Sequence, residues 1–160
     1  MIKSVYLASP LGFAESSRPF MEVLVDRLRE HVVVVNPWDD QRFAADFAEL
    51  EHVDSVKDRF ARLAAINSEL GRANTERIDA VNAVFGVLDG VDVDSGTAAE
   101  IGYAFARGKY VAGLRTDFRL AGDNPGSIVN LQVQYFIEQS GGMVVTTVEE
   151  FVGLARALST

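Results

Sequence analysis

Short apolar runs alternate with longer amphipathic segments along this chain of 160 residues. The most regular run, at 83–88, reads Ala-Val-Phe-Gly-Val-Leu and ends at Asp89-Gly90, a pair typical of a turn. Other runs that predict strands lie at 2–8, 32–35, 110–114 and 143–146. Because a helical segment separates each strand from the next, we expect one mostly parallel sheet of about five strands. The expected fold class is therefore α/β, a doubly wound sheet with helices on both faces.

The segments between these runs predict helices, and the length of the chain indicates one domain over 1–160. Helices are expected at about 16–30, 54–80, 96–107, 127–139 and from 147 onward. In the long second helix Phe60, Leu63 and Leu70 fall on or near one face, and Gly71 marks a point of bending or breakage. The polar loop 115–126 is the longest break and is expected to act as a mobile lid.

Composition narrows the classes of function that the chain can have. With 15 basic and 23 acidic residues the net charge is −8, which argues against binding to a nucleic-acid backbone. The absence of cysteine excludes disulfides, thiolate metal sites and Cys nucleophiles, and His31 and His52 lack the spacing of metal ligands. The apolar start is too short for a signal peptide, and no run approaches the ~20 apolar residues of a membrane span. A cytoplasmic protein without membrane contact is the expectation.

The segment 94–104, Asp-Ser-Gly-Thr-Ala-Ala-Glu-Ile-Gly-Tyr-Ala, follows a predicted strand and an acidic loop. Ligands of open α/β sheets bind at this end of the strands. With Ser95 as the expected N-cap, Glu100 lies in the early turns of a helix, whose dipole favours the ionised carboxylate. Such a carboxylate can stabilise an oxocarbenium ion or attack its carbon to form a glycosyl ester, and Gly96 would let a ligand approach the backbone. A solvated first-turn acid is the alternative interpretation of Glu100.

Four motifs, in this order and spacing, resemble the nucleoside 2-deoxyribosyltransferases over nearly the whole chain. They are Tyr-Leu-Ala-Ser-Pro at 6–10, Leu-Asp-Gly at 88–90, the segment 94–104, and Asn-Leu-Gln at 130–132. The resemblance implies a flavodoxin-like fold and the transfer of 2-deoxyribose between nucleobases. It also implies 2′-deoxynucleosides and free nucleobases as ligands, with no metal or organic cofactor.

The resemblance also implies roles for single residues. Glu100 matches the nucleophile that attacks C1′ and forms a covalent 2-deoxyribosyl ester, which a second base resolves with net retention. Tyr6 matches a tyrosine whose hydroxyl contacts that nucleophile; a core aromatic is the alternative. Asp94 and Asn130 match residues that hold the sugar 5′-hydroxyl. In the family this asparagine comes from a neighbouring subunit, which implies a homo-oligomer with shared active sites; a helix cap or surface amide is the alternative for Asn130.

Several positions depart from the better-known bacterial pattern or extend it. Asn74 stands where that pattern has an aspartate that contacts the base and helps to protonate it. An amide can hydrogen-bond a base edge but cannot act as a general acid, so Asp89, Asp92 or water is left to supply the proton. Gln132 stands where some members have Met. Asp117, in the predicted lid loop, could reach the ligand or could be a solvated loop acid.

Three other functions stay open. Hydrolases of 2′-deoxynucleoside 5′-monophosphates share the fold but have Ser at the positions of Asp94 and Asn130. A carboxylate at Asp94 would repel a 5′-phosphate and accept a hydrogen bond from a 5′-hydroxyl, so free nucleosides are expected. A phospho-receiver would use Asp89, but loop 9–12 has no acidic pair to hold Mg²⁺. A non-catalytic module, in which Glu100 only positions a ligand, is the third.

Overall fold

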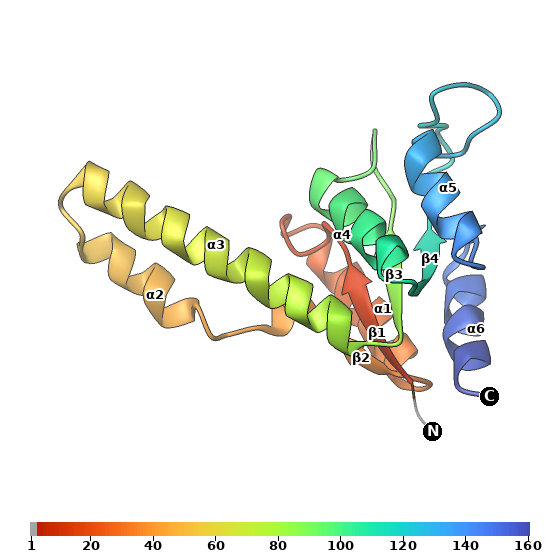
Figure 1. Cartoon of the computed structure of the whole chain (residues 1–160), viewed down its shortest axis with the longest axis horizontal. Helices are drawn as coiled ribbons and strands as arrows, with labels where there is room; N and C mark the ends of the chain where they lie inside the picture. The colour runs from red at the N-terminus through yellow and green to blue at the C-terminus, as the bar shows by residue number, and fades with distance from the viewer. Residues whose placement is uncertain (1–2) are drawn as a thin grey trace.

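A parallel five-stranded sheet forms the centre of the computed structural model, which describes residues 3–160 (Figure 1). The strands are β1 (Ser4–Ala8), β2 (Val33–Val35), β3 (Ala83–Val87), β4 (Tyr110–Leu114) and β5 (Val144–Val145). They lie in the order β2-β1-β3-β4-β5, and each neighbouring pair is parallel. This is the flavodoxin-like strand order, so the expected fold class is confirmed. Residue 2 of the first predicted strand lies outside the described residues.

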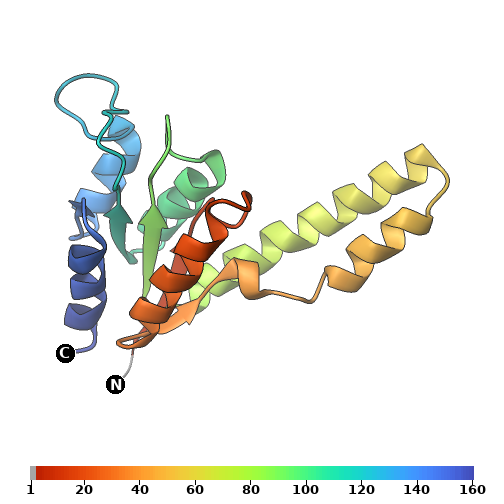
Figure 2. The same ribbon diagram turned by 180° about the vertical axis from the view of Figure 1, so that it is seen from behind.

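Helices cover both faces of the sheet, as the alternation predicts (Figures 1 and 2). They are α1 (Arg18–Arg29), α2 (Ala44–Glu49), α3 (Val56–Ala80), α4 (Ser95–Ala106), α5 (Leu131–Gln139) and α6 (Val148–Leu158), with short 3-10 helices η1 (Pro37–Asp39) and η2 (Leu50–His52). Helices α1 and α6 pack on one face, while α4, α5 and the end of α3 pack on the other. None of the described helices combines the length and apolar character that a membrane span requires.

Each central strand contributes side chains to two separate cores. Val5 and Leu7 of β1 point to the core under α1 and α6, while Tyr6 and Ala8 point to the core under α4 and α5. Successive side chains of a strand alternate between faces, so a strand covered on both sides needs apolar residues throughout. This requirement explains the unbroken apolar runs in the sequence.

Helix α3 and α2 form an arm that leaves the body of the molecule (Figures 1 and 2). We call residues 44–70 the arm; within it, Arg62 of α3 lies 3.9 Å from the Glu49 carboxylate of α2. Helix α3 continues through Gly71 without a break, and its two buried residues both belong to the half nearer the sheet. The apolar face expected for this helix is therefore largely unburied in the arm, where Phe60 is 65% exposed.

A buried arginine side chain anchors the start of the predicted lid loop. Arg115 is 1% exposed, and its guanidinium donates to the backbone oxygens of Leu88, Gly90 and Arg119. These bonds join the loop after β4 to the loop after β3. The beginning of the lid is thus packed against its neighbouring loop, and the carboxyl ends of the two strands are held together.

Candidate active site

Tyr6 and Glu100 meet at the carboxyl end of the sheet. Tyr6 lies in β1 and is fully buried, and its hydroxyl donates to Oε1 of Glu100 at 2.6 Å. Glu100 lies in the second turn of α4, which crosses above β1 and β3. Burial, reinforced by the charge of Glu100, raises the pKa of Tyr6 far above its ordinary value. The phenol therefore stays protonated and acts as a hydrogen-bond donor to the carboxylate.

The pKa of the Glu100 carboxyl is raised. Burial is the largest cause, the hydrogen bond from Tyr6 opposes it, and the charge of Asp94 adds to it. The helix dipole considered from the sequence favours the ionised form, whereas burial favours the neutral one, and the pKa of this carboxyl is raised. A poorly hydrated carboxylate with one oxygen held by a phenol can attack an electrophilic carbon with its other oxygen.

Asp94 is the N-cap of α4, one residue earlier than the Ser95 expected from the sequence. Its Oδ2 accepts from the Thr97 amide at 2.9 Å and from the Thr97 hydroxyl at 3.2 Å. Within residues 3–160 its Oδ1 accepts no hydrogen bond, so this oxygen is free to accept one from a ligand hydroxyl. A Cβ at Gly96 would lie 3.1 Å from Oδ2, so a larger residue would crowd the cap.

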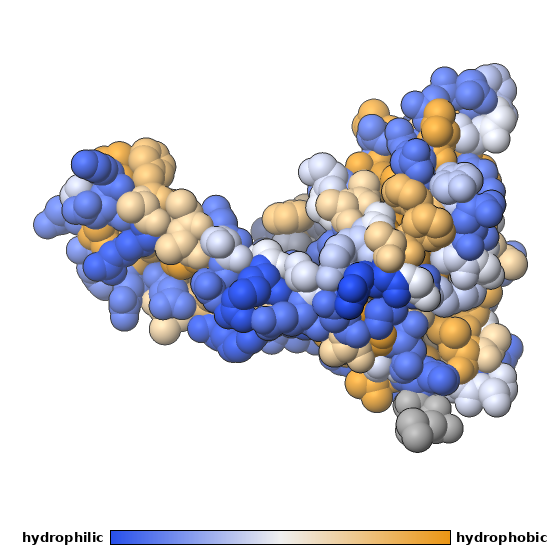
Figure 3. Space-filling view, viewed as in Figure 1, coloured by the Kyte–Doolittle hydropathy of each residue, from blue (hydrophilic) through white to orange (hydrophobic). Residues whose placement is uncertain are grey.

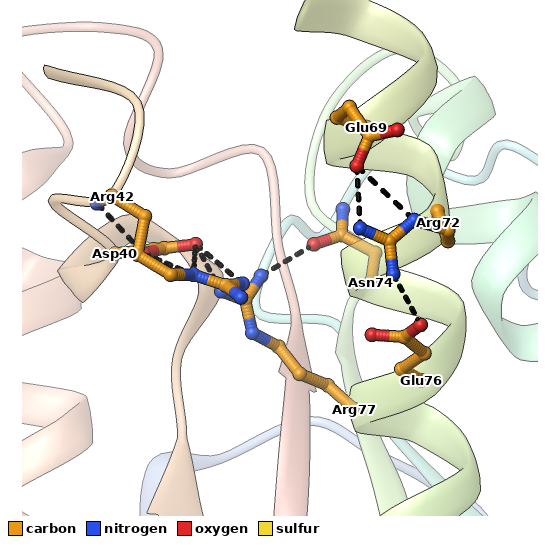
Figure 4. A network of polar contacts seen from close by, with 7 residues as sticks. All are labelled: Asp40, Arg42, Glu69, Arg72, Asn74, Glu76 and Arg77. Atoms are coloured by element: carbon orange, nitrogen blue, oxygen red, sulfur yellow. Dashed lines mark hydrogen bonds and ion pairs between the residues drawn. The ribbon is translucent and has the colours of Figure 1, made fainter. Parts of the chain in front are cut away.

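Asn74 reaches the same place from α3. Its Nδ2 lies 3.4 Å from Oε1 of Glu100, and its Oδ1 accepts from Arg77 Nη1 at 2.9 Å. Figure 4 shows that Arg77 also pairs with Asp40, whose carboxylate binds Arg42 as well. Hydrogen bonds from Arg42, and the bond and charge of Arg77, hold the pKa of Asp40 well below its ordinary value.

One cavity of about 500 Å³, a size typical of small-molecule sites, is lined by four of these side chains: Asp40, Asn74, Asp94 and Glu100. Its polar end carries Asn74, Asp94 and Glu100. Its apolar wall consists of Phe13, Trp38, Phe43, Phe47 and Leu70. Such a cavity fits a ligand that joins a flat aromatic ring to a hydroxyl-bearing group.

Trp38 is fixed in this wall by two neighbours. Its indole nitrogen donates to the Ser9 carbonyl oxygen at 2.9 Å, and the ring of Phe13 packs edge-on at 4.6 Å. A Cβ at Gly12 would lie 2.0 Å from the Trp38 ring, so the indole lies directly against the glycine backbone. No sequence motif marks this wall, although Trp38 follows β2 and thus lies at the ligand-binding end of the sheet.

Three acids singled out in the sequence do not line this cavity in the described part of the chain. Asp89 accepts from the amides of Thr116 and Asp117 at 2.6 and 2.8 Å, and so holds the start of the lid loop. Asp117 binds Arg119, which lowers the pKa of its carboxyl. Asp92 accepts from the adjacent backbone amide at 2.7 Å. Within a single chain, these three carboxylates therefore stabilise loops, by accepting hydrogen bonds from backbone amides or by pairing with Arg119.

Asn130 and Gln132 also lie away from the cavity within residues 3–160. Asn130 is the N-cap of α5, and its Oδ1 accepts from the amides of Gln132 and Val133 at 3.0 and 3.3 Å. The side chain of Asn130 thus fulfils the capping role that the sequence offers as its alternative. Its role in a partner's site stays a prediction, as does any role of the exposed Gln132.

No group of three His, Asp or Glu side chains placed to hold a metal ion occurs in the part of the chain that the structure describes. The site's carboxylates are used otherwise: Asp94 caps a helix, Glu100 binds a phenol and Asp40 binds two guanidinium groups. The groups that the site offers to a ligand are therefore carboxylates, a phenol and an amide.

A family model described as nucleoside 2-deoxyribosyltransferase matches residues 5–132, four fifths of the chain. The match includes Tyr6, Asn74, Asp94 and Glu100, the residues that the fold brings together. The chain belongs to the nucleoside 2-deoxyribosyltransferase family. Membership makes this protein an enzyme that acts on nucleosides through glycosyl transfer.

Solved structures of similar fold match nearly the whole chain. A conserved protein from Enterococcus faecalis matches with a TM-score of 0.69 and 23% identity, over 99% of both chains. A 2-deoxyribosyltransferase from Leishmania mexicana matches with a TM-score of 0.64 and 21% identity, over 97% of both chains. A CMP N-glycosidase from Clostridium botulinum matches with a TM-score of 0.55 and 17% identity, over 95% of this chain and 97% of its own. No protein of curated function matches the sequence.

Proposed function

We propose that this enzyme exchanges the nucleobase of 2′-deoxynucleosides by a double displacement at C1′. A Glu100 oxygen attacks C1′, the bond from C1′ to the base nitrogen breaks, and its electron pair leaves with the base. The product is a 2-deoxyribosyl ester of Glu100. A nitrogen of a second base then attacks C1′ and releases the carboxylate, so that two inversions give net retention. The single observation that carries the proposal is the hydrogen bond of 2.6 Å from the Tyr6 hydroxyl to Glu100, which lines the polar end of the cavity.

Tyr6 holds the nucleophile in this mechanism. Because its hydroxyl donates to Oε1, the second oxygen of Glu100 is the one left to attack. The raised pKa of Tyr6 keeps the phenol protonated, so it neither competes as a nucleophile nor adds charge. When the ester forms, Glu100 loses the charge that burial disfavours, which helps the first displacement.

Free deoxynucleosides are the substrates that the charges of the site favour. Asp94 and Glu100 place two carboxylates at one end of the cavity, and a 5′-phosphate next to them would meet like charge. The cations near the cavity, Arg42 and Arg77, already pair with Asp40. A 5′-hydroxyl, by contrast, can donate to Oδ1 of Asp94.

Water is the proposed source of the proton that the leaving base takes up. Asn74, which faces the nucleophile, has no proton to give at neutral pH. Asp89 and Asp92, the other candidates from the sequence, lie in loops outside the cavity. The incoming base loses a proton in the second step, so the exchange leaves the number of protons unchanged.

A hydrolase of 2′-deoxynucleoside 5′-monophosphates is the second candidate, because the fold is similar to that of a CMP N-glycosidase. Product analysis by chromatography, with a deoxynucleoside in the presence and absence of a second free base, distinguishes the two. A new nucleoside means transfer, and base release alone means hydrolysis. Faster cleavage of dAMP or dCMP than of the matching nucleosides would contradict the substrate assignment. Glu100→Ala is expected to abolish both reactions, and residual activity within about tenfold of the wild type would contradict the role of Glu100.

We further propose that the enzyme is a homo-oligomer in which Asn130 of one subunit contacts the substrate of another. Two observations support an assembly. The arm leaves Val56 and Phe60 60% and 65% exposed, and Figure 3 shows apolar residues gathered near its end. The cavity wall includes Phe47 and Leu70 of the same arm, so a subunit seated there would lie close to the site.

A further inference from the structure

The amide of Asn74 lies between two groups that both require the same orientation. A guanidinium can only donate hydrogen bonds, so the atom 2.9 Å from Arg77 Nη1 must be the oxygen of Asn74. An ionised carboxylate can only accept, so the atom 3.4 Å from Glu100 Oε1 must be its nitrogen. Rotation of the amide by a half turn would place oxygen against oxygen and nitrogen against nitrogen.

Arg77 is itself held by Asp40 (Figure 4). The side chain of Asp40 is 9% exposed and that of Arg77 18%. Asp40 also accepts from the Arg42 amide at 3.0 Å and from its guanidinium at 2.9 Å. Because Asp40 follows β2 and Arg77 lies on α3, the ion pair joins the loop that carries Trp38 to the helix that carries Asn74.

The geometry points to Arg77 as a positioning residue that makes Asn74 a hydrogen-bond donor toward the ligand. Asp40 accepts from both neighbouring guanidinium groups, and Glu100 accepts from Tyr6 and, in the proposed function, attacks the sugar carbon. The group left to read the base on the α3 side is thus the Nδ2 of Asn74. The enzyme is therefore expected to select bases that present an acceptor there, an unprotonated ring nitrogen or a carbonyl oxygen. This inference rests on the proposed function, since it assigns a base to this end of the cavity.

A side-chain amide of Asn74 that is fixed as a donor and one that is free to rotate lead to different ligand preferences. If Arg77 is replaced by methionine, only the 3.4 Å contact with Glu100 still opposes a turn of the amide, so the preference for bases with the acceptor weakens. If Arg77 is replaced by lysine, a group that only donates still faces the oxygen. Arg77→Met should therefore lower discrimination and Arg77→Lys should retain it, whereas a merely structural role would lower the affinity for all bases equally.

Intrinsic fluorescence supplies the measurement, because Trp38 is the only tryptophan of the chain and lines the cavity. The wild type is titrated with adenine and with 1-, 3- and 7-deazaadenine, each of which replaces one acceptor nitrogen with C–H. One analogue is expected to bind about tenfold more weakly, which corresponds to one lost hydrogen bond. Arg77→Met should lower this ratio by about twofold or more, and Arg77→Lys should keep most of it.

Arg72→Met is the matched control. Arg72 lies on the same helix and also pairs with acids, Glu69 and Glu76, but makes no hydrogen bond to Asn74 within residues 3–160 (Figure 4). Its replacement should leave the ratio unchanged. Equal affinity for all four bases in the wild type, an unchanged ratio in Arg77→Met, or no binding of adenine would overturn the inference. The proposed function has a separate readout, since wild-type base release from deoxynucleosides tests it without reference to Arg77.

Discussion

At the scale of the residue, the ionisation of Glu100 sets the pH range of the reaction. The carboxylate is the attacking form, and burial raises its pKa, so kcat/KM should fall as the pH drops through a value above the ordinary pKa of about 4.3. Tyr6→Phe removes the hydrogen bond that lowers this pKa and should move the acid limb to higher pH. Asp94→Asn removes the charge that raises it and should move the limb to lower pH. The measurement is kcat/KM as a function of pH for the three proteins.

The opposite directions of these two shifts make the test specific. Asparagine is as good an N-cap as aspartate, so α4 should keep its start in Asp94→Asn. A general loss of stability would shift the acid limbs of the two variants in the same direction, or would shift neither of them. If both variants moved the limb in one direction, Glu100 would not be the group that titrates.

Gly12 is expected to be intolerant of even the smallest side chain. Its Cβ position lies 2.0 Å from the Trp38 ring, so Gly12→Ala must displace the indole from the cavity wall. We expect a rise in the KM or Kd for nucleosides of about tenfold or more, with a smaller loss of kcat. Gly153→Ala serves as the control, because a Cβ at that position would meet nothing within 4 Å. Gly108→Ala is unsuitable as a control, because the φ of Gly108 is +69° and a side chain there would strain the backbone. Equal kinetics in Gly12→Ala and Gly153→Ala would contradict this account of the wall.

Residues inside sequence motifs could be predicted, and residues that reach the site through packing could not. Tyr6, Asp94 and Glu100 belong to recognisable motifs and do meet at the cavity. Arg77 and Asp40 are separated by 37 positions, and only the approach of α3 to the loop after β2 joins them. No local pattern marks such a pair, so its role emerges from the fold alone.

At the scale of the element, Asn130 has a measurable structural task. As the N-cap of α5 it accepts from two backbone amides, and Asn130→Ala should cost about 1 kcal/mol. That cost corresponds to a fall in Tm of about 2–4 °C for a domain of this size. Asn130→Ser should keep the cap and most of the Tm. If Asn130→Ser also keeps full activity, the proposed contact with a substrate in another subunit is wrong.

Element boundaries differ from their sequence predictions for reasons of hydrogen bonding. The predicted helix at 127–139 begins at Leu131, because Asn130 caps it and residues 127–129 continue the irregular chain that follows the lid loop. The N-cap of α4 is Asp94 and not Ser95, although both residue types cap well. The helix expected from 147 onward begins with a capping box, in which Thr147 Oγ1 accepts from the Glu150 amide and the Glu150 carboxylate accepts from the Thr147 amide. Where two neighbouring residues can cap, the path of the preceding loop decides between them.

At the scale of the whole molecule, the arm is the feature that the single chain does not explain. The spacing of Phe60, Leu63 and Leu70 predicts an apolar helix face that packs against something. Yet Phe60 is 65% exposed in the described chain, while Ala73 and Ile78, nearer the sheet, are buried. The periodicity of α3 predicts the helix and its apolar face, but no element within residues 3–160 covers Phe60 in its outer half.

A second copy of the chain is the partner that we propose, and the arm supplies the test. Phe60→Glu places a charge on the exposed apolar face and should convert the oligomer to smaller species in analytical ultracentrifugation. Ser68→Glu adds the same charge at an exposed polar position of the same helix and should leave the assembly intact. If the sites are shared, Phe60→Glu should also lose base exchange, although Tyr6 and Glu100 lie elsewhere in the fold. A monomeric wild type, or a dissociated variant with full activity, would contradict a site completed by a neighbouring subunit.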